Sequence, residues 1–167
     1  MNEVIGKSLK SITDNYNLIW QTGKTGVPAS VNQDVLQSAV RDRHLAVHDF
    51  VDDMPSAYSI ADLAICRAGA MTLAELAAAG VPAVLIPYPY ATDDHQTVNA
   101  QSVVDSGGAI RIRDDELSDV TLLSAITSCL QYPQVHKNMS QAMKSLDRPR
   151  AALEIAGITL RAAKDRA

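Results

Sequence analysis

The chain has 167 residues and a formal net charge of −4, with 47% hydrophobic and 20% charged residues. This length suits one domain that can bury a substantial core. Aromatic residues make up only 4% of the chain, so we expect no stacking platform for nucleic acid, and the acidic balance argues against a polyanionic partner. The two cysteines give no disulfide framework, and no apolar run reaches the roughly 18 residues typical of a transmembrane helix.

Helix and strand patterns alternate along the chain, which is typical of an α/β domain. The segment 2–14 places its apolar residues on one helical face, and NLIWQT at 17–22 predicts a strand. The sequence RPR at 148–150 is a possible hinge before the last helix of a single domain, 1–167. The other expected elements are a helix at 29–40, a strand at 44–50, a helix at 53–60, a strand at 62–67, a helix at 71–79, a strand at 81–87, a loop and helix at 93–107, a strand at 109–113, and helices at 117–130, 133–146 and 149–164.

The stretch from 62 to 100 carries the clearest signals. Its helix, 71–79, consists of strong helix formers and stops at Gly80, where a C-cap glycine belongs. The next strand, 81–87, is apolar on successive residues, as in strands that are buried on both faces of a parallel sheet. We therefore expect a right-handed βαβ unit within a doubly wound α/β fold, a parallel sheet with helices on both faces.

The turn RAGAMT at 67–72 joins the first strand of this unit to its helix. Its small residues let a ligand approach the backbone, and the first amides of a helix attract a phosphate. Glu75 lies three residues after Thr72, which leaves two interpretations open. The pair forms a capping box that needs no ligand, or Glu75 accepts hydrogen bonds from the ribose hydroxyls of a nucleotide whose phosphates lie on the turn.

A longer run of motifs surrounds this turn. The sequence CRAGAMTLAELAAAGVPAVLIPYPYATDDHQTVNAQSVVDSGGA occupies 66–109, and WQTGK at 20–24 and DFVDDM at 49–54 precede it. In this order the motifs closely resemble the C-terminal domain of the MurG-like glycosyltransferases, bacterial N-acetylglucosaminyltransferases of glycosyltransferase family 28 with the GT-B fold. The resemblance covers nearly the whole chain.

The resemblance implies that this chain is the UDP-N-acetylglucosamine-binding half of an inverting enzyme, which converts lipid I to lipid II in peptidoglycan synthesis. Amides of Ala70, Met71 and Thr72 would hold the diphosphate, and Glu75 would hold the ribose. The enzyme would use no cofactor besides its donor substrate. It would act in the cytoplasm, as a peripheral protein on the inner face of the cell membrane.

The resemblance also assigns residues to the uracil base and to the hexose of the donor. The Val51 backbone would face the uracil edge, with Met54 packing nearby, while Gln96 and Asn99 would bind the hexose hydroxyls. Gln96 is assigned by counting back from Asn99, and His95 is the near alternative. No catalytic residue is expected in this chain.

No metal site is expected either. The acidic pairs at 52–53, 93–94 and 114–115 stand at predicted helix starts or loops, where carboxylates cap helices.

In the resembling family, the domain opens with a strand and a glycine-rich loop, whereas this chain begins at the helix that follows them. We therefore expect the first strand to be missing, with no direct pairing between 17–22 and 62–67 and some tendency to self-associate. The acceptor domain, in the same or a separate chain, would bind the lipid-linked acceptor, so the isolated chain is expected to be inactive. The alternative is a UDP-sugar-binding subunit or fragment of another GT-B glycosyltransferase, non-catalytic without a partner domain.

Overall fold

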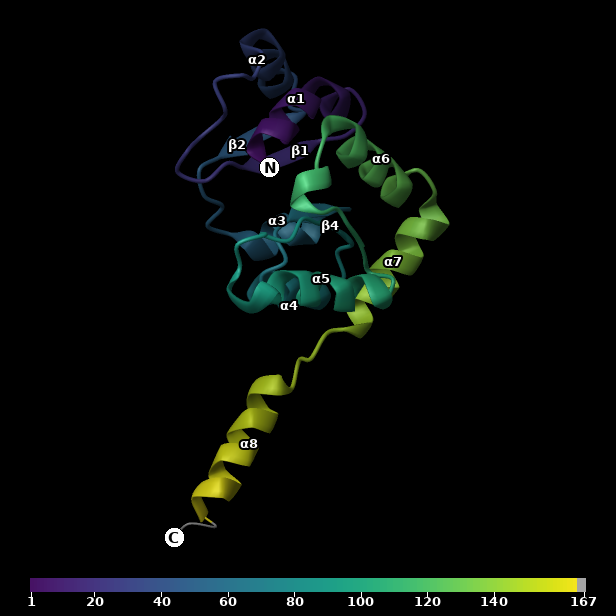
Figure 1. Ribbon diagram of the computed structural model, residues 1–167. Coiled ribbons are helices and arrows are strands. Elements are labelled where there is room, and N and C mark those ends of the chain that lie inside the picture. Colours follow the sequence, from purple (N-terminus) through teal and green to yellow (C-terminus); the bar gives the residue numbers. More distant parts are fainter. Residues whose placement is uncertain (165–167) are drawn as a thin grey trace.

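The computed structural model describes residues 1–164 and shows a mixed α/β fold in which helices and strands alternate (Figure 1). The order of helices and strands agrees with the sequence prediction, although all five strands are shorter than predicted. The strands are β1 (Leu18–Gln21), β2 (Leu45–His48), β3 (Ala64–Cys66), β4 (Ala83–Leu85) and β5 (Ala109–Arg111). The helices are α1 (Asn2–Thr13), α2 (Gln33–Arg41), α3 (Met54–Ile60), α4 (Ala70–Ala79), α5 (His95–Asp105), α6 (Asp119–Leu130), α7 (Pro133–Ser145) and α8 (Ala151–Lys164), with short 3-10 turns η1 (Thr92–Asp94) and η2 (Asp114–Glu116).

All strand pairs are parallel, but they form two sheets instead of one. One sheet has the order β1-β2 and the other has the order β3-β4-β5. Strands β1 and β3 are therefore not paired with each other, which confirms the prediction that 17–22 and 62–67 do not meet directly.

Side-chain caps fix where several helices begin. The Asn32 side chain accepts hydrogen bonds from the amides of Asp34 and Val35, so α2 begins at Gln33 and the predicted start at 29 is wrong. Asp53 caps α3 in the same way, and Gly80 ends α4 in the left-handed region at φ 73°.

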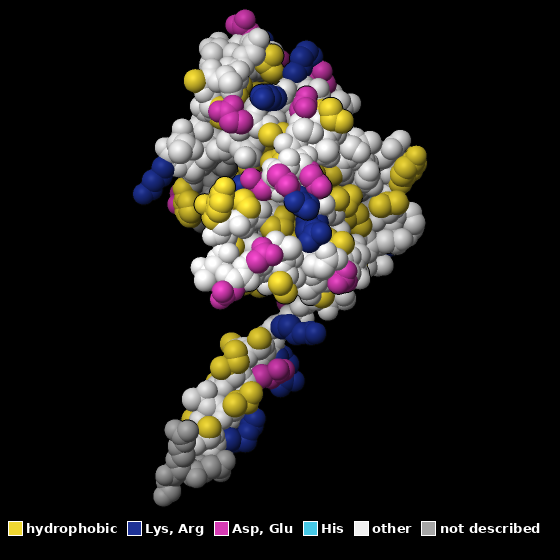
Figure 2. Space-filling model, in the orientation of Figure 1, with side chains coloured by type: hydrophobic (Ala, Val, Ile, Leu, Met, Phe, Trp, Pro, Cys, Tyr) yellow, Lys and Arg dark blue, Asp and Glu magenta, His cyan; other side chains and the backbone are white. Residues whose placement is uncertain are grey.

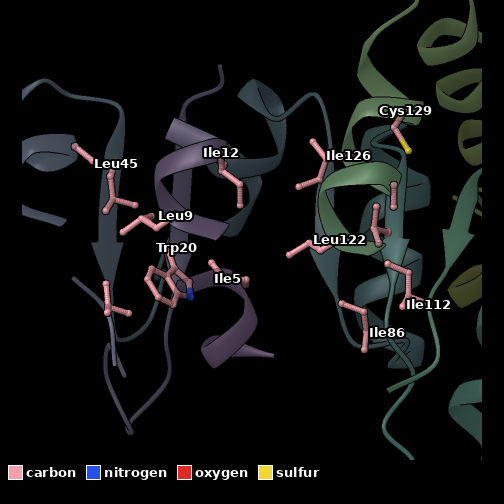
Figure 3. Packing of buried hydrophobic residues seen from close by; sticks show 14 of the residues in the cluster. Ile5, Leu9, Ile12, Trp20, Leu45, Ile86, Ile112, Leu122, Ile126 and Cys129 are labelled. Carbon is pink, nitrogen blue, oxygen red and sulfur yellow. The ribbon is translucent and has the colours of Figure 1, made fainter. Parts of the chain in front are cut away.

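The main hydrophobic core joins the two sheets through helices α1 and α6. Figure 3 shows Ile5 and Ile12 of α1 facing Leu122 and Ile126 of α6. The same buried cluster contains Trp20 of β1 and residues that follow β4 and β5. Because β1 and β3 share no strand pairing, this packing holds the two sheets in position.

A second buried cluster covers the opposite side of the larger sheet. It brings Leu76 of α4, Val103 of α5 and Met143 of α7 against Leu85 of β4. Helices therefore lie on both faces of the β3-β4-β5 sheet, as expected for a doubly wound fold.

Helix α8 extends away from the rest of the molecule after the connection 146–150 (Figure 1). Its large apolar side chains are exposed, including Leu153 and Leu160, and Figure 2 shows them along the helix beside basic residues. The hinge predicted at 148–150 falls in this connection. Among residues 1–164, no helix has the length and apolar character that a membrane span requires.

The packing of α1 and α6 that joins the two sheets, called the joint below, can be tested with Leu122→Ala. The Leu122 side chain is only 1% exposed and lies in the cluster that both sheets share. Its truncation should lower the free energy of unfolding by about 2–5 kcal/mol, measured by chemical denaturation. Leu153→Ala on α8 is the matched control, because Leu153 is 69% exposed. Equal stability of the two variants would contradict a joint through α1 and α6.

Candidate functional site

The predicted site residues all follow the carboxyl ends of parallel strands. Val51 and Met54 come after β2, residues 70–75 come after β3, and Gln96 and Asn99 come after β4. In open parallel sheets this edge is where ligands bind.

The ends of β1 and β3 border one cavity of about 620 Å³. Gln21 and Thr22 line it from the first sheet, and Arg67 lines it from the second. The carboxyl edges of both sheets therefore open on the same side of the molecule.

The N-terminus of α4 offers free donors. Gly69 is the N-cap residue, and the first backbone hydrogen bond of the helix runs from the Leu73 amide to the Gly69 carbonyl at 3.0 Å. Within residues 1–164, the amides of Ala70, Met71 and Thr72 donate to no acceptor. Unpaired amides at a helix N-terminus, together with the helix dipole, are the arrangement that attracts anions.

The capping box proposed for Thr72 and Glu75 is not formed. The cap is Gly69, which has no side chain, and Thr72 lies inside the helix. The Glu75 carboxylate accepts a hydrogen bond from the hydroxyl of Tyr58 instead, at 3.1 Å. Among the described residues this is its only hydrogen bond, so one carboxylate oxygen is left to accept from a ligand.

Met54 and Glu75 lie on the same cavity. This cavity, of about 420 Å³, runs between α3 and α4. Its other lining residues are Pro55, Tyr58, Ser59, Ala78 and Ala79. The predicted base-packing and ribose-binding side chains are thus brought together although 21 positions separate them.

The Val51 amide has a partner that sequence reasoning missed. It donates to the side-chain oxygen of Gln21, at the end of β1, over 2.9 Å. Gln21 thus presents a carbonyl oxygen to the amide that the resemblance assigns to the uracil edge. The signal available in the sequence was a polar residue at the carboxyl end of the first predicted strand.

Gln96 and Asn99 bind the loops around them. The Tyr88 amide donates to Gln96 at 3.0 Å, and the Asn99 side chain donates to the Ala68 carbonyl at 3.3 Å. Both side chains are partly buried, whereas His95 at the start of α5 is exposed. This inward placement favours Gln96 over His95 as the residue predicted to bind the hexose together with Asn99.

Arg67 holds the loop that follows β4. Its Nη1 donates to the carbonyls of Ile86 and Pro87, each at 3.1 Å, and pairs with Asp114 at 2.5 Å. Its guanidinium also lies 5.5 Å from the centre of the Tyr88 ring. Arg67 therefore fixes the segment that leads to Gln96.

Four carboxylates of the acidic pairs, those of Asp53, Asp94, Asp114 and Asp115, have partners in the chain itself. Asp114 pairs with Arg67, and the hydrogen bond from Arg113 lowers the pKa of Asp115. Hydrogen bonds from Ser56 likewise lower the pKa of Asp53 at the start of α3. In the part of the chain that the structure describes, no three His, Cys, Asp or Glu side chains are grouped as metal ligands.

The cysteines are poor nucleophiles. Burial raises the pKa of Cys66 to about 12 and that of Cys129 to about 11. Both thiols are free and stay protonated near neutral pH, so neither supplies a thiolate.

Comparison with known proteins identifies the family. Residues 1–155 match the model of the glycosyltransferase family 28 C-terminal domain. The chain belongs to this family. A UDP-N-acetylglucosamine–N-acetylmuramyl-(pentapeptide) pyrophosphoryl-undecaprenol N-acetylglucosamine transferase of Myxococcus xanthus is 40% identical over 151 residues, which are 90% of this chain and 38% of that protein. The equally named protein of Methylococcus capsulatus is 47% identical over 114 residues, 68% of this chain and 32% of that protein.

Solved structures agree with this family 28 assignment. The crystal structure of MurG from Acinetobacter baumannii superposes with a TM-score of 0.81 at 33% identity, covering 96% of this chain and 45% of that one. The glycotransferase of kitacinnamycin, at 24% identity and a TM-score of 0.65, shares the fold. The family 28 domain described here thus spans less than half the length of these relatives.

Proposed function

We propose that this chain is the donor-binding half of an inverting N-acetylglucosaminyltransferase. The intact enzyme would transfer N-acetylglucosamine from UDP-N-acetylglucosamine to the C4 hydroxyl of the muramoyl sugar of lipid I, which gives lipid II for peptidoglycan. The observation that carries the proposal is the set of three free amides on α4, one turn before the Glu75 carboxylate. A nucleotide diphosphate matches this pairing, because its phosphates need donors and its ribose hydroxyls need an acceptor.

Each part of the donor would have its own group in the site. The amides of Ala70, Met71 and Thr72 would bind the diphosphate, and their fixed dipoles would stabilise the charge that develops as UDP departs. Glu75 would hold the ribose. A base that deprotonates the acceptor hydroxyl would come from outside this chain.

The base and the hexose would lie on either side of the diphosphate. The Val51 backbone would meet the uracil once Gln21 moves away, with Met54 packing beside it, and Gln96 and Asn99 would select the sugar. In this proposal the reaction needs no metal ion or cofactor.

The acceptor and the location follow from the same proposal. The relatives are more than twice as long as this chain, so a further domain would supply the acceptor site, in the same or a separate chain. A lipid-linked acceptor would place the enzyme on the cytoplasmic face of the membrane as a peripheral protein.

Nucleotide preference tests the proposed donor. UDP should bind this chain more tightly than GDP, ADP or TDP in calorimetric titrations, because the Val51 backbone would match the edge of uracil. Tighter binding of ADP or GDP would contradict the assignment of the base.

Glu75→Gln tests the ribose contact. The change should weaken UDP binding by about 1–3 kcal/mol, the scale for hydrogen bonds to a charged group, and should leave thermal stability nearly unchanged because the side chain is exposed. Glu154→Gln on α8 is the matched control and should bind UDP as the unmodified chain does. Full UDP affinity in Glu75→Gln would rule out the ribose role.

A further inference from the structure

The hydroxyl of Tyr58 is the one group in the described chain that holds the Glu75 side chain. The two residues stand on different helices, α3 and α4, and their oxygens are 3.1 Å apart. A glutamate on a helix surface otherwise samples several rotamers, and fixing such a side chain costs conformational entropy. A donor that already fixes the carboxylate removes part of this cost from ligand binding.

Tyr58 is itself held in place. Its ring packs against the second buried cluster, which contains Leu76 and Ala77 of α4. Burial, together with the hydrogen bond to Glu75, raises the pKa of the Tyr58 hydroxyl, so the hydroxyl remains a donor throughout the physiological pH range. The donor thus has a fixed position and a fixed protonation state.

The bond leaves Glu75 competent for a ligand. Only Oε2 accepts from Tyr58, and a carboxylate has about four acceptor sites on its two oxygens. The cavity between α3 and α4 is lined by Tyr58, Glu75 and Met54, so the tyrosine stands beside the carboxylate on the surface where the nucleoside would lie.

We propose that Tyr58 is a positioning residue that orients Glu75 toward the ribose hydroxyls of the bound nucleotide. The proposal rests on the proposed function, in which Glu75 accepts from the ribose. The effect of the Tyr58 hydroxyl would pass through the carboxylate of Glu75, whereas its ring would remain part of the cavity lining in the Phe variant. If Tyr58 only stabilised the packing of α3 against α4, removing its hydroxyl would instead change the binding affinity of every nucleotide by the same factor.

The experiment compares two probes, UDP and 2′,3′-dideoxyuridine diphosphate, which lacks both ribose hydroxyls. Tyr58→Phe keeps the ring and removes the hydroxyl. It should weaken UDP binding about three- to tenfold, the loss of one hydrogen bond, and leave binding of the dideoxy analogue unchanged. Tyr132→Phe is the control, because Tyr132 is 59% exposed and its hydroxyl makes no hydrogen bond within residues 1–164.

The decisive readout is the affinity for UDP divided by the affinity for the dideoxy analogue. Any loss of folded protein lowers both affinities by the same factor, so it cancels in this ratio. In a Glu75→Ala background, Tyr58→Phe should change neither affinity further, since no acceptor for the Tyr58 hydroxyl is left at position 75. An unchanged ratio in Tyr58→Phe with a lowered ratio in Glu75→Gln overturns the role of Tyr58 and leaves the proposed function standing. An unchanged ratio in Glu75→Gln removes the ribose contact itself, and the role of Tyr58 with it.

Discussion

The packing of α1 against α6 holds together two parallel sheets that share no strand pairing. The candidate site depends on this joint because its parts are divided between the sheets. Val51 and Met54 follow β2 of the first sheet, whereas the free amides of α4 follow β3 of the second. A nucleotide that bridges base and phosphate subsites would therefore bridge the two sheets, and a shift between them would change the distance that it must span.

Besides the core, polar contacts between loops, strands and helices hold the parts of the candidate site in position. Gln21 holds the segment after β2, Arg67 holds the loop after β4, and Tyr58 links α3 to Glu75 of α4. Each contact joins segments that belong to different strands or helices. The contacts of Arg67 and Tyr58 would set the site geometry before a ligand arrives and so lower the ordering cost of binding, whereas the Gln21 contact would open for the uracil. The three amides of α4 are left without partners, as a site for an anion requires.

The sequence was sufficient for the order of elements, because hydrophobic patterning and glycines mark strands and helix ends locally. It also located the turn that opens α4, since a strand, small residues and a helix start follow one another in the chain; the phosphate role of that turn stays a prediction. The contacts of Glu75 and Arg67 could not be predicted from the sequence. Their partners, Tyr58 and Asp114, lie 17 and 47 positions away in the chain and meet them only once helices and loops have packed. The start of α2 was missed for a local reason, the cap formed by Asn32.

The central claim is that both sheets contribute to a single nucleotide site. An NMR titration of the isotopically labelled chain with UDP tests this claim most directly, through the backbone amides of Val51 and of Ala70, Met71 and Thr72. The account predicts that these amides, from both sheets, shift together and saturate with one dissociation constant. Shifts confined to one sheet, or two sets that saturate at different UDP concentrations, would contradict it.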